Sequence, residues 1–119
     1  MARRGRRWVC ELRGPSILGA DAIRTYKRVT IGQPLVLIRE PNNPVDVNAV
    51  LVSDLMGVAF SYVDRDAAAL IAPVMDAGVM LLAKIKTTAS LGKPFRYATA
   101  TIWEDGLEEE ITIREKENA

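Results

Sequence analysis

The sequence predicts a mostly β protein with minor α content, built as a small OB-like barrel of six or seven strands. Short apolar runs rich in β-branched residues recur along the chain and are separated by turns that contain Gly, Pro, Asn or Asp. One segment, residues 65–72, predicts a helix, and it falls between the fourth and fifth strands. The length of 119 residues suits a single domain.

In the first half of the chain, Gly14, Pro15 and Gly19 predict a loop over residues 13–21. Residues 22–31 are ambiguous. If they are extended, Arg24, Tyr26 and Arg28 share one side, where the ring could stack on a base beside a bound phosphate. The alternative is a half-buried tyrosine with solvated cations around it. Strands are expected at residues 8–12, 35–38, 49–53 and 58–63.

In the second half, Asp64 is expected to cap a helix that begins at Arg65. Pro73 is incompatible with a regular helix interior, so we expect the helix to run to Ala72 and to continue as a kinked turn that ends at Gly78. Further strands are expected at residues 79–88 and 95–103, and an acidic edge strand at residues 108–113.

The composition argues against most catalytic chemistry. The chain has no histidine and one cysteine, which excludes a Cys/His zinc site and any Ser-His-Asp or Cys-His arrangement within it. It has no Gly-x-x-x-x-Gly-Lys-Ser/Thr phosphate loop. Cys10 alternates with Trp8 and Leu12 on an apolar strand face, as a small buried residue would. We therefore expect a non-enzymatic protein with no metal and no cofactor.

The chain also lacks the features of a membrane protein. No apolar run approaches the roughly 20 residues needed to cross a bilayer. The arginines near the N-terminus are not followed by the apolar stretch of a secretory signal. The sequence therefore predicts a cytoplasmic protein with no membrane partner.

Charge is distributed unevenly although the formal net charge is only +1. Residues 1–40 carry nine Lys or Arg against three acids, whereas residues 101–119 carry two against seven. Such asymmetry can give a basic face that binds phosphates, although the terminal charges could simply be solvated. We expect a flexible basic tail over residues 1–7, a single domain over residues 8–113 and a frayed end at residues 114–119. The tail is either an electrostatic arm for nucleic acid or a solubilising end.

The connector between residues 39 and 49 is the most unusual stretch of the sequence. It contains two prolines and four Asn or Asp residues, which together favour a rigid loop of fixed shape. A simple chain reversal needs only about two residues. The loop is therefore either a solvated connector that satisfies its own backbone or a preorganised polar shelf for a ligand.

Arg39-Glu40-Pro41-x-Asn43-Pro44-x-Asp46-x-Asn48-Ala49 defines eight positions over eleven residues, and this string resembles the HIRAN domain family. The similarity extends over residues 30–80 and includes Gly57, the Tyr62-Val63 pair and Ala68-x-x-Ile71-Ala72-Pro73. Family members are small β-rich modules, fused to helicase-like ATPases or standing alone. The resemblance implies a modified OB barrel with a helical insertion.

The resemblance also implies a function: binding of single-stranded DNA and capture of a free 3′ end, in DNA repair or replication. By match to the motif, Asp46 would accept a hydrogen bond from the 3′ hydroxyl, and Arg39, Asn43 and Asn48 would frame the pocket. Val45 departs from the aromatic residue found there in DNA-binding relatives. The alternative is therefore a protein-interaction module that keeps the barrel without the DNA-end pocket. The candidate nucleic-acid-binding residues are Arg24, Tyr26, Lys27, Arg28, Arg39, Asn43, Asp46, Asn48 and, from the late strand, Tyr97.

Overall fold

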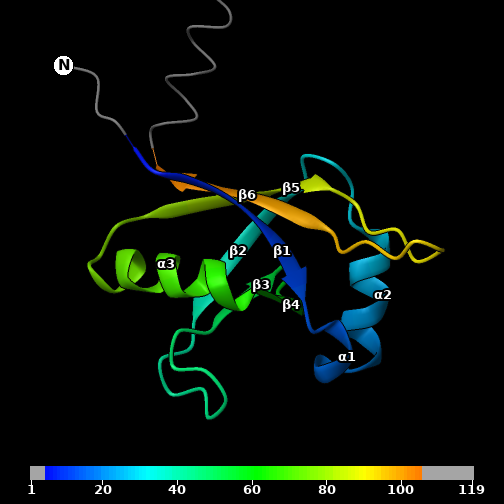
Figure 1. Ribbon diagram of the computed structural model, residues 1–119, viewed down its shortest axis with the longest axis horizontal. Helices are drawn as coiled ribbons and strands as arrows, with labels where there is room; N and C mark the ends of the chain where they lie inside the picture. The colour runs from blue at the N-terminus through cyan, green and yellow to red at the C-terminus, as the bar shows by residue number, and fades with distance from the viewer. Residues whose placement is uncertain (1–4, 106–119) are drawn as a thin grey trace, which may run out of the picture.

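A computed structural model describes residues 5–105 of the chain (Figure 1). Residues 1–4 of the expected basic tail lie outside this range, as do the expected strand at 108–113 and the expected end at 114–119. Within residues 5–105, no helix is both long enough and apolar enough to span a membrane.

Six antiparallel strands form a closed barrel in the order β1-β4-β3-β2-β5-β6, which confirms the predicted fold class. Closure comes from β1, which pairs with β6 through Cys10 and Ala100 and with β4 through Leu12 and Val63. Because a closed barrel has no free edge, its backbone groups are satisfied by neighbouring strands. The strands are β1 (Arg7–Arg13), β2 (Pro34–Arg39), β3 (Val50–Ser53), β4 (Ala59–Val63), β5 (Leu81–Thr87) and β6 (Thr99–Glu104).

The barrel interior is filled by alternate residues from every strand. Leu12, Phe60 and Ile102 are fully buried there, and Cys10 is 4% exposed. Burial raises the pKa of the Cys10 thiol to about 12, with a smaller contribution from nearby Asp64. Cys10 is thus a small core residue, as its place on the apolar strand face predicted.

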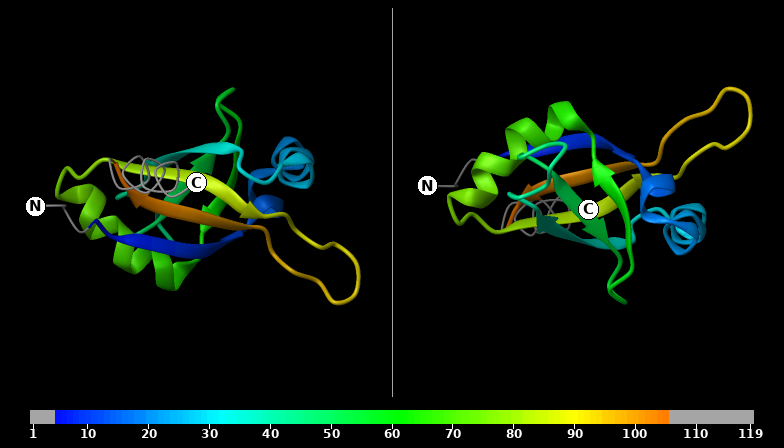
Figure 2. Two further views of the ribbon diagram at one scale, coloured as in Figure 1. Left: turned by 90° about the horizontal axis from the view of Figure 1, so that it is seen from above. Right: turned by 90° about the horizontal axis from the view of Figure 1, so that it is seen from below.

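The α3 helix (Arg65–Asp76) lies between β4 and β5, as predicted, and runs across one end of the barrel (Figure 2). Asp64 caps it by accepting a hydrogen bond from the Ala67 N–H at 3.0 Å. The expected end of the regular helix at Ala72 is wrong, because the helix continues through Pro73 to Asp76. Pro73 and Ala69 are both exposed, so the Ala69 carbonyl that loses its helical partner can bond to water.

Two helices between β1 and β2 were not predicted: α1 (Pro15–Leu18), inside the expected loop, and α2 (Ala20–Arg28), inside the segment left ambiguous. The extended alternative for residues 22–31 is therefore wrong. Ala22 and Tyr26, four residues apart, form the buried face of α2. Asp21 in its first turn and Lys27 and Arg28 in its last turn complement the helix dipole.

The strand expected at residues 95–103 begins four residues later than predicted, at Thr99. Residues 95–98 belong to the long β5–β6 hairpin, where Ser90 and Arg96 form an isolated bridge, and β6 begins only at Thr99. Residues 79 and 80 likewise precede β5. Figure 2 shows the hairpin projecting beyond the barrel.

Candidate functional site

The loop of residues 40–49 is shaped by its own Asn and Asp side chains. Asn43 Oδ1 accepts hydrogen bonds from the backbone N–H groups of Val45, at 2.9 Å, and Asp46, at 3.1 Å. Asp46 Oδ1 in turn accepts from the Asn48 N–H at 2.9 Å. These local side-chain bonds replace a strand ladder over the loop and fix the direction of the Asp46 carboxylate.

Glu40 ties this loop to the barrel wall. Its Oε1 accepts a hydrogen bond from the Tyr62 hydroxyl at 2.8 Å and another from Asn43 Nδ2 at 3.0 Å. Burial and the bond to Glu40 raise the pKa of Tyr62 from 10.0 to about 12, so its hydroxyl remains a donor even in mildly alkaline solution. The loop and the Tyr62 ring are therefore held together as one unit.

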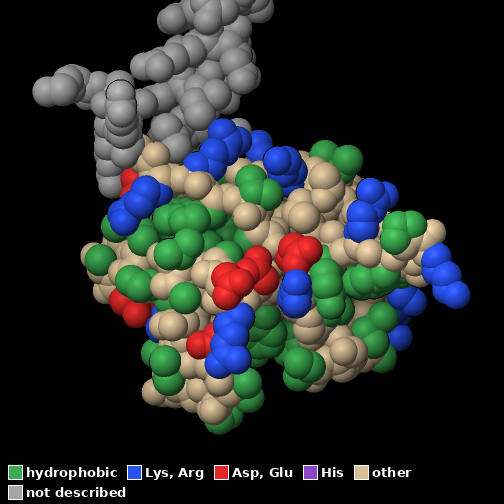
Figure 3. All heavy atoms as spheres, in the orientation of Figure 1, with side chains coloured by type: hydrophobic (Ala, Val, Ile, Leu, Met, Phe, Trp, Pro, Cys, Tyr) green, Lys and Arg blue, Asp and Glu red, His purple; other side chains and the backbone are tan. Residues whose placement is uncertain are grey.

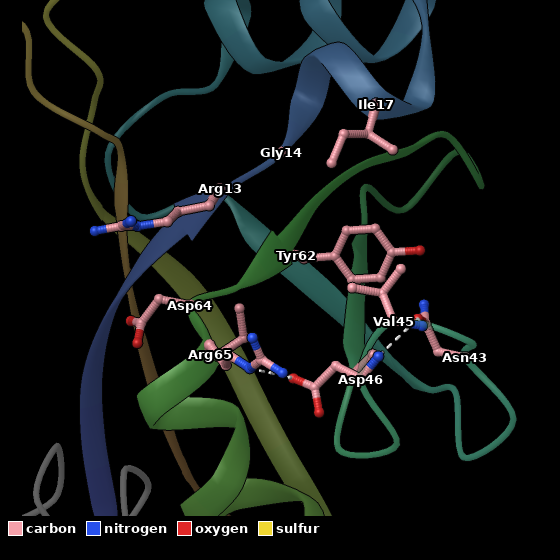
Figure 4. Close-up of a pocket in the computed structure, with 11 residues that line it drawn as sticks. Arg13, Gly14, Ile17, Asn43, Val45, Asp46, Tyr62, Asp64 and Arg65 are labelled. Atoms are coloured by element: carbon pink, nitrogen blue, oxygen red, sulfur yellow. Dashed lines mark hydrogen bonds and ion pairs between the residues drawn. The ribbon is translucent and has the colours of Figure 1, made fainter.

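A pocket of about 300 Å³ opens beside this unit (Figure 4). Ile17 from α1, the Tyr62 ring and Val45 make a continuous apolar side, and Asp46 and Arg65 face each other below it. The mixture of an apolar wall with a few convergent polar groups is typical of a small-ligand site. The lining residues are Arg13, Gly14, Ile17, Asn43, Val45, Asp46, Ala49, Tyr62, Val63, Asp64 and Arg65.

Two carboxylates line the pocket, but their chemistry differs. Asp64 uses one oxygen for the Glu11 N–H, at 2.9 Å, and the other to cap α3. Asp46 uses Oδ1 for the loop backbone, while Oδ2 lies 3.9 Å from Arg65 Nε. Arg65 is 77% exposed and Asp46 21%. Asp46 thus keeps an oxygen that a ligand donor can reach at the pocket, and an exposed cation lies beside it.

Arg13 connects this pocket to a second hollow of about 540 Å³ at the base of the β5–β6 hairpin. Its side chain extends away from Tyr62 in Figure 4, and its guanidinium lies 4.6 Å from the centre of the Tyr97 ring. Tyr97 meets Phe95 edge to face at 4.8 Å, and Phe95 is half exposed. The second hollow is lined by Glu11, Ile31, Thr87, Thr88, Phe95, Arg96, Tyr97 and Thr99.

Of the predicted site residues, only Asn43 and Asp46 line the first pocket, and Tyr97 lines the second. Asn48 contributes its backbone N–H to Asp46. Arg39 lies elsewhere: its Nε and Nη2 donate to the two Asp76 oxygens at 3.0 and 3.2 Å, and its Nη1 donates to the Ala49 carbonyl at 3.1 Å. With only 15% of its side chain exposed, Arg39 holds the loop to α3.

Tyr26 is a core residue and cannot stack on a base, because it is 3% exposed. Its hydroxyl donates to the Leu12 carbonyl and accepts from the Ala98 N–H, both at 2.8 Å. Arg24, Lys27 and Arg28 lie on the exposed side of α2, where Arg24 pairs with Asp21. In Figure 3 Lys and Arg side chains lie along the upper rim and at the right of this face, and others lie beside the Asp and Glu side chains near its centre.

Arg13, Ile17 and Arg65 were not among the predicted site residues. Arg65 directly follows the predicted cap Asp64, so a helix start close to the 39–49 loop could have indicated it. Arg13 ends β1 next to Gly14, whose φ of +77° favours glycine. Nothing in the local sequence places Ile17, since α1 itself was unexpected.

Comparison with known proteins decides the family. The HIRAN domain model matches residues 14–101, which is more than half of the chain. The chain belongs to the HIRAN domain family. This family is known for nucleic-acid-binding modules that are generally non-catalytic.

Two solved structures share the fold. The chain resembles a structural-genomics protein from Lactobacillus plantarum, with a TM-score of 0.69 and 21% identity over 85% of this chain and 97% of that one. It also resembles the HIRAN domain of human HLTF, with a TM-score of 0.55 and 21% identity over 90% of this chain and 81% of that one. No curated protein matches the sequence. Across residues 5–105 there is no group of three or more Cys, Asp or Glu side chains that could hold a metal ion.

Proposed function

We propose that this HIRAN domain binds single-stranded DNA by a free 3′ end, with the terminal nucleotide in the pocket beside the 40–49 loop. The observation that carries the proposal is the Asp46 carboxylate. Its Oδ1 is fixed by the Asn48 N–H, which leaves Oδ2 at the pocket as an acceptor. A carboxylate accepts a hydrogen bond from a terminal hydroxyl, whereas it repels a terminal phosphate.

The apolar side of the pocket suits the sugar and base. Val45 and Ile17 are each 81% exposed and flank the Tyr62 ring, so they can enclose a nucleoside without a polar group that selects one base. Val45 cannot stack as an aromatic residue does, and one stacking platform contributes about 1–3 kcal/mol. We therefore expect weaker binding than an aromatic at this position would give.

The following nucleotides would run along Arg13 toward the hairpin. Arg13 lines the terminal pocket and its guanidinium covers Tyr97, so it can meet a phosphate between the two hollows. Phe95, half exposed beside Tyr97, offers a face on which a base can stack. Arg65 offers a second cation at the mouth of the pocket. Lys27 and Arg28 remain candidates for long-range attraction only.

Equilibrium titration of the full chain with labelled single-stranded oligonucleotides tests this proposal. We expect tighter binding to an oligonucleotide with a 3′ hydroxyl than to the same oligonucleotide with a 3′ phosphate, and weaker binding of both at higher salt. Equal affinity for the two ends would remove the end-reading role. Absence of binding at low salt would exclude DNA as the ligand.

A role in DNA repair or replication and a location in the cytoplasm remain predictions from the sequence.

A protein-interaction module is the second candidate, and Val45 is the observation that favours it. An 81% exposed valine beside an apolar wall can receive an apolar side chain of a partner as readily as a base. This alternative predicts that an Asp46→Asn variant binds every oligonucleotide as weakly as the wild type does.

A further inference from the structure

The outer faces of β2 and β5, which are neighbours in the barrel (Figure 2, left), carry an exposed apolar surface. The antiparallel register of the two strands places Val36 beside Leu82 and Ile38 beside Met80. Val36, Ile38 and Leu82 are 39–41% exposed, and Met80, which directly precedes β5, is 65% exposed. The helices within residues 5–105 lie elsewhere, since α1 and α2 pack against β4 and α3 crosses one end of the barrel.

These four side chains form one continuous patch. Cross-strand neighbours on one face of a sheet have Cβ atoms about 4.5–5.5 Å apart, so each pair is in contact range. The two pairs are adjacent, because Val36 and Ile38, like Met80 and Leu82, are two residues apart on the same face. Single exposed apolar residues are ordinary, whereas a contiguous group of them is typical of a surface on which another protein packs.

Charges of opposite sign lie at the two ends of this surface. At one end Asp105 is exposed, and its backbone N–H donates to the Met80 carbonyl at 3.0 Å. At the other end Lys86 is exposed on β5, after the buried Ile85. Met80 and Lys86 are six positions apart, and a strand rises about 3.3 Å per residue, so Asp105 and Lys86 lie about 20 Å apart and cannot pair within one copy. A surface of this kind is complementary to a second copy turned end for end.

We propose that two copies of this chain pair through this surface around a two-fold axis. An axis near Leu82 brings the apolar patch of one copy onto that of the other, as in face-to-face packing of sheets. The same rotation places Lys86 of each copy at the Asp105 end of the other, so the charges form a polar rim around an apolar contact. β5 lies opposite β4 in the strand order, so the pocket beside Tyr62 stays open in the pair. The inference does not depend on the proposed DNA binding.

Sedimentation equilibrium of the full chain over a range of concentrations tests the pairing. We expect a reversible equilibrium between monomer and dimer. Leu82→Glu should raise the dimer dissociation constant more than about tenfold, because two carboxylates would meet near the axis. The matched control, Leu55→Glu, changes an exposed leucine in the turn between β3 and β4 and should leave the constant unchanged. A monomer at every concentration would leave the surface to a different protein and overturn the proposal, as would equal effects of the two variants.

Charge reversal tests how the two copies are oriented. Lys86→Glu and Asp105→Lys should each raise the dissociation constant severalfold, because each brings like charges together. The double variant exchanges the two charges, so we expect its constant to return to within about twofold of the wild-type value. Since Lys86 and Asp105 are too far apart to meet within one copy, this rescue can arise only between copies. Additive losses in the double variant would show that the arrangement is wrong.

Far-UV circular dichroism of every variant checks that the barrel is intact. We expect all the spectra to match that of the wild type, because the changed side chains are exposed. If Leu82→Glu unfolds the barrel, the charge-reversal variants still decide the question, since neither Lys86 nor Asp105 contributes a buried side chain.

Discussion

At the scale of single residues, we expect position 45 to determine how strongly the proposed pocket holds a base. Val45 points into the opening beside Tyr62 and is 81% exposed, so a larger side chain meets little hindrance there. Its backbone N–H is already held by Asn43, which fixes where a new side chain would project. The residue can therefore change without rebuilding the loop.

We predict that Val45→Tyr tightens binding of a 3′-hydroxyl oligonucleotide by about 1–3 kcal/mol, because it adds a stacking platform. Fluorescence anisotropy titration at one fixed salt concentration measures the change. Val45→Leu, which adds apolar area without an aromatic face, is the matched control and should have a much smaller effect. Equal gains in affinity from both variants would mean that aromatic stacking is not the source of the tighter binding.

Residue-level chemistry also explains which of the predicted site residues lie at the pocket. Asp46 and Asn43 line the pocket because their roles depend on neighbours two or three positions away, and local sequence specifies such contacts. Arg39 and Tyr26 have other roles because their partners, Asp76 and Ala98, are distant in sequence. A cation or an aromatic side chain near a motif has the same appearance in sequence whether it faces a ligand or another segment of the protein.

At the scale of elements, α3 is fastened to the 39–49 segment at both ends. Arg65 in its first turn approaches Asp46, and Asp76 at its last residue receives two hydrogen bonds from Arg39. The second link is the stronger, since it is bidentate and Arg39 is largely buried. This link fixes the position of the loop that carries Asp46 relative to α3.

We predict that Arg39→Met lowers the free energy of unfolding by about 1–3 kcal/mol, because the Ala49 carbonyl and Asp76 lose charge-assisted donors. Urea unfolding followed by circular dichroism measures the loss. Arg24→Met, which breaks an exposed pair on α2, is the control and should change stability by less than about 0.5 kcal/mol. If the two variants lost the same free energy of unfolding, Arg39 would stabilise the fold no more than an exposed ion pair does.

The helices show where element prediction from sequence reaches its limit. The strands and α3 were predicted because their apolar pattern or cap is local. The short α1 and α2 were missed because Gly14, Pro15 and Gly19, read as loop signals, instead mark their boundaries. Only packing of Ala22 and Tyr26 on the barrel distinguishes α2 from an extended segment.

At the scale of the whole molecule, burial raises the pKa of a thiol and two phenols in the described part of the chain. Burial raises the pKa of Cys10 from 9.0 and that of Tyr62 from 10.0, each to about 12, and it also raises the pKa of Tyr26. As the pH rises, the unfolded chain therefore loses these protons before the folded protein does. The stability they contribute is fully present below about pH 9 and is lost toward pH 12.

We predict that the urea midpoint falls as pH is raised from about 8 to about 11. Tyr62→Phe should make this fall less steep, because the phenylalanine has no proton to lose in either state. A midpoint independent of pH over this range would contradict the account.

The central claim is that Asp46 reads a terminal hydroxyl, and a double-mutant cycle tests it most directly. Wild-type and Asp46→Asn proteins are each titrated with an oligonucleotide ending in a 3′ hydroxyl and with its 3′-deoxy counterpart. Asparagine keeps an oxygen for the Asn48 N–H, so the loop is preserved. We predict a coupling of about 1.5–3 kcal/mol between the carboxylate and the hydroxyl. Additive losses, with no coupling, would contradict the claim.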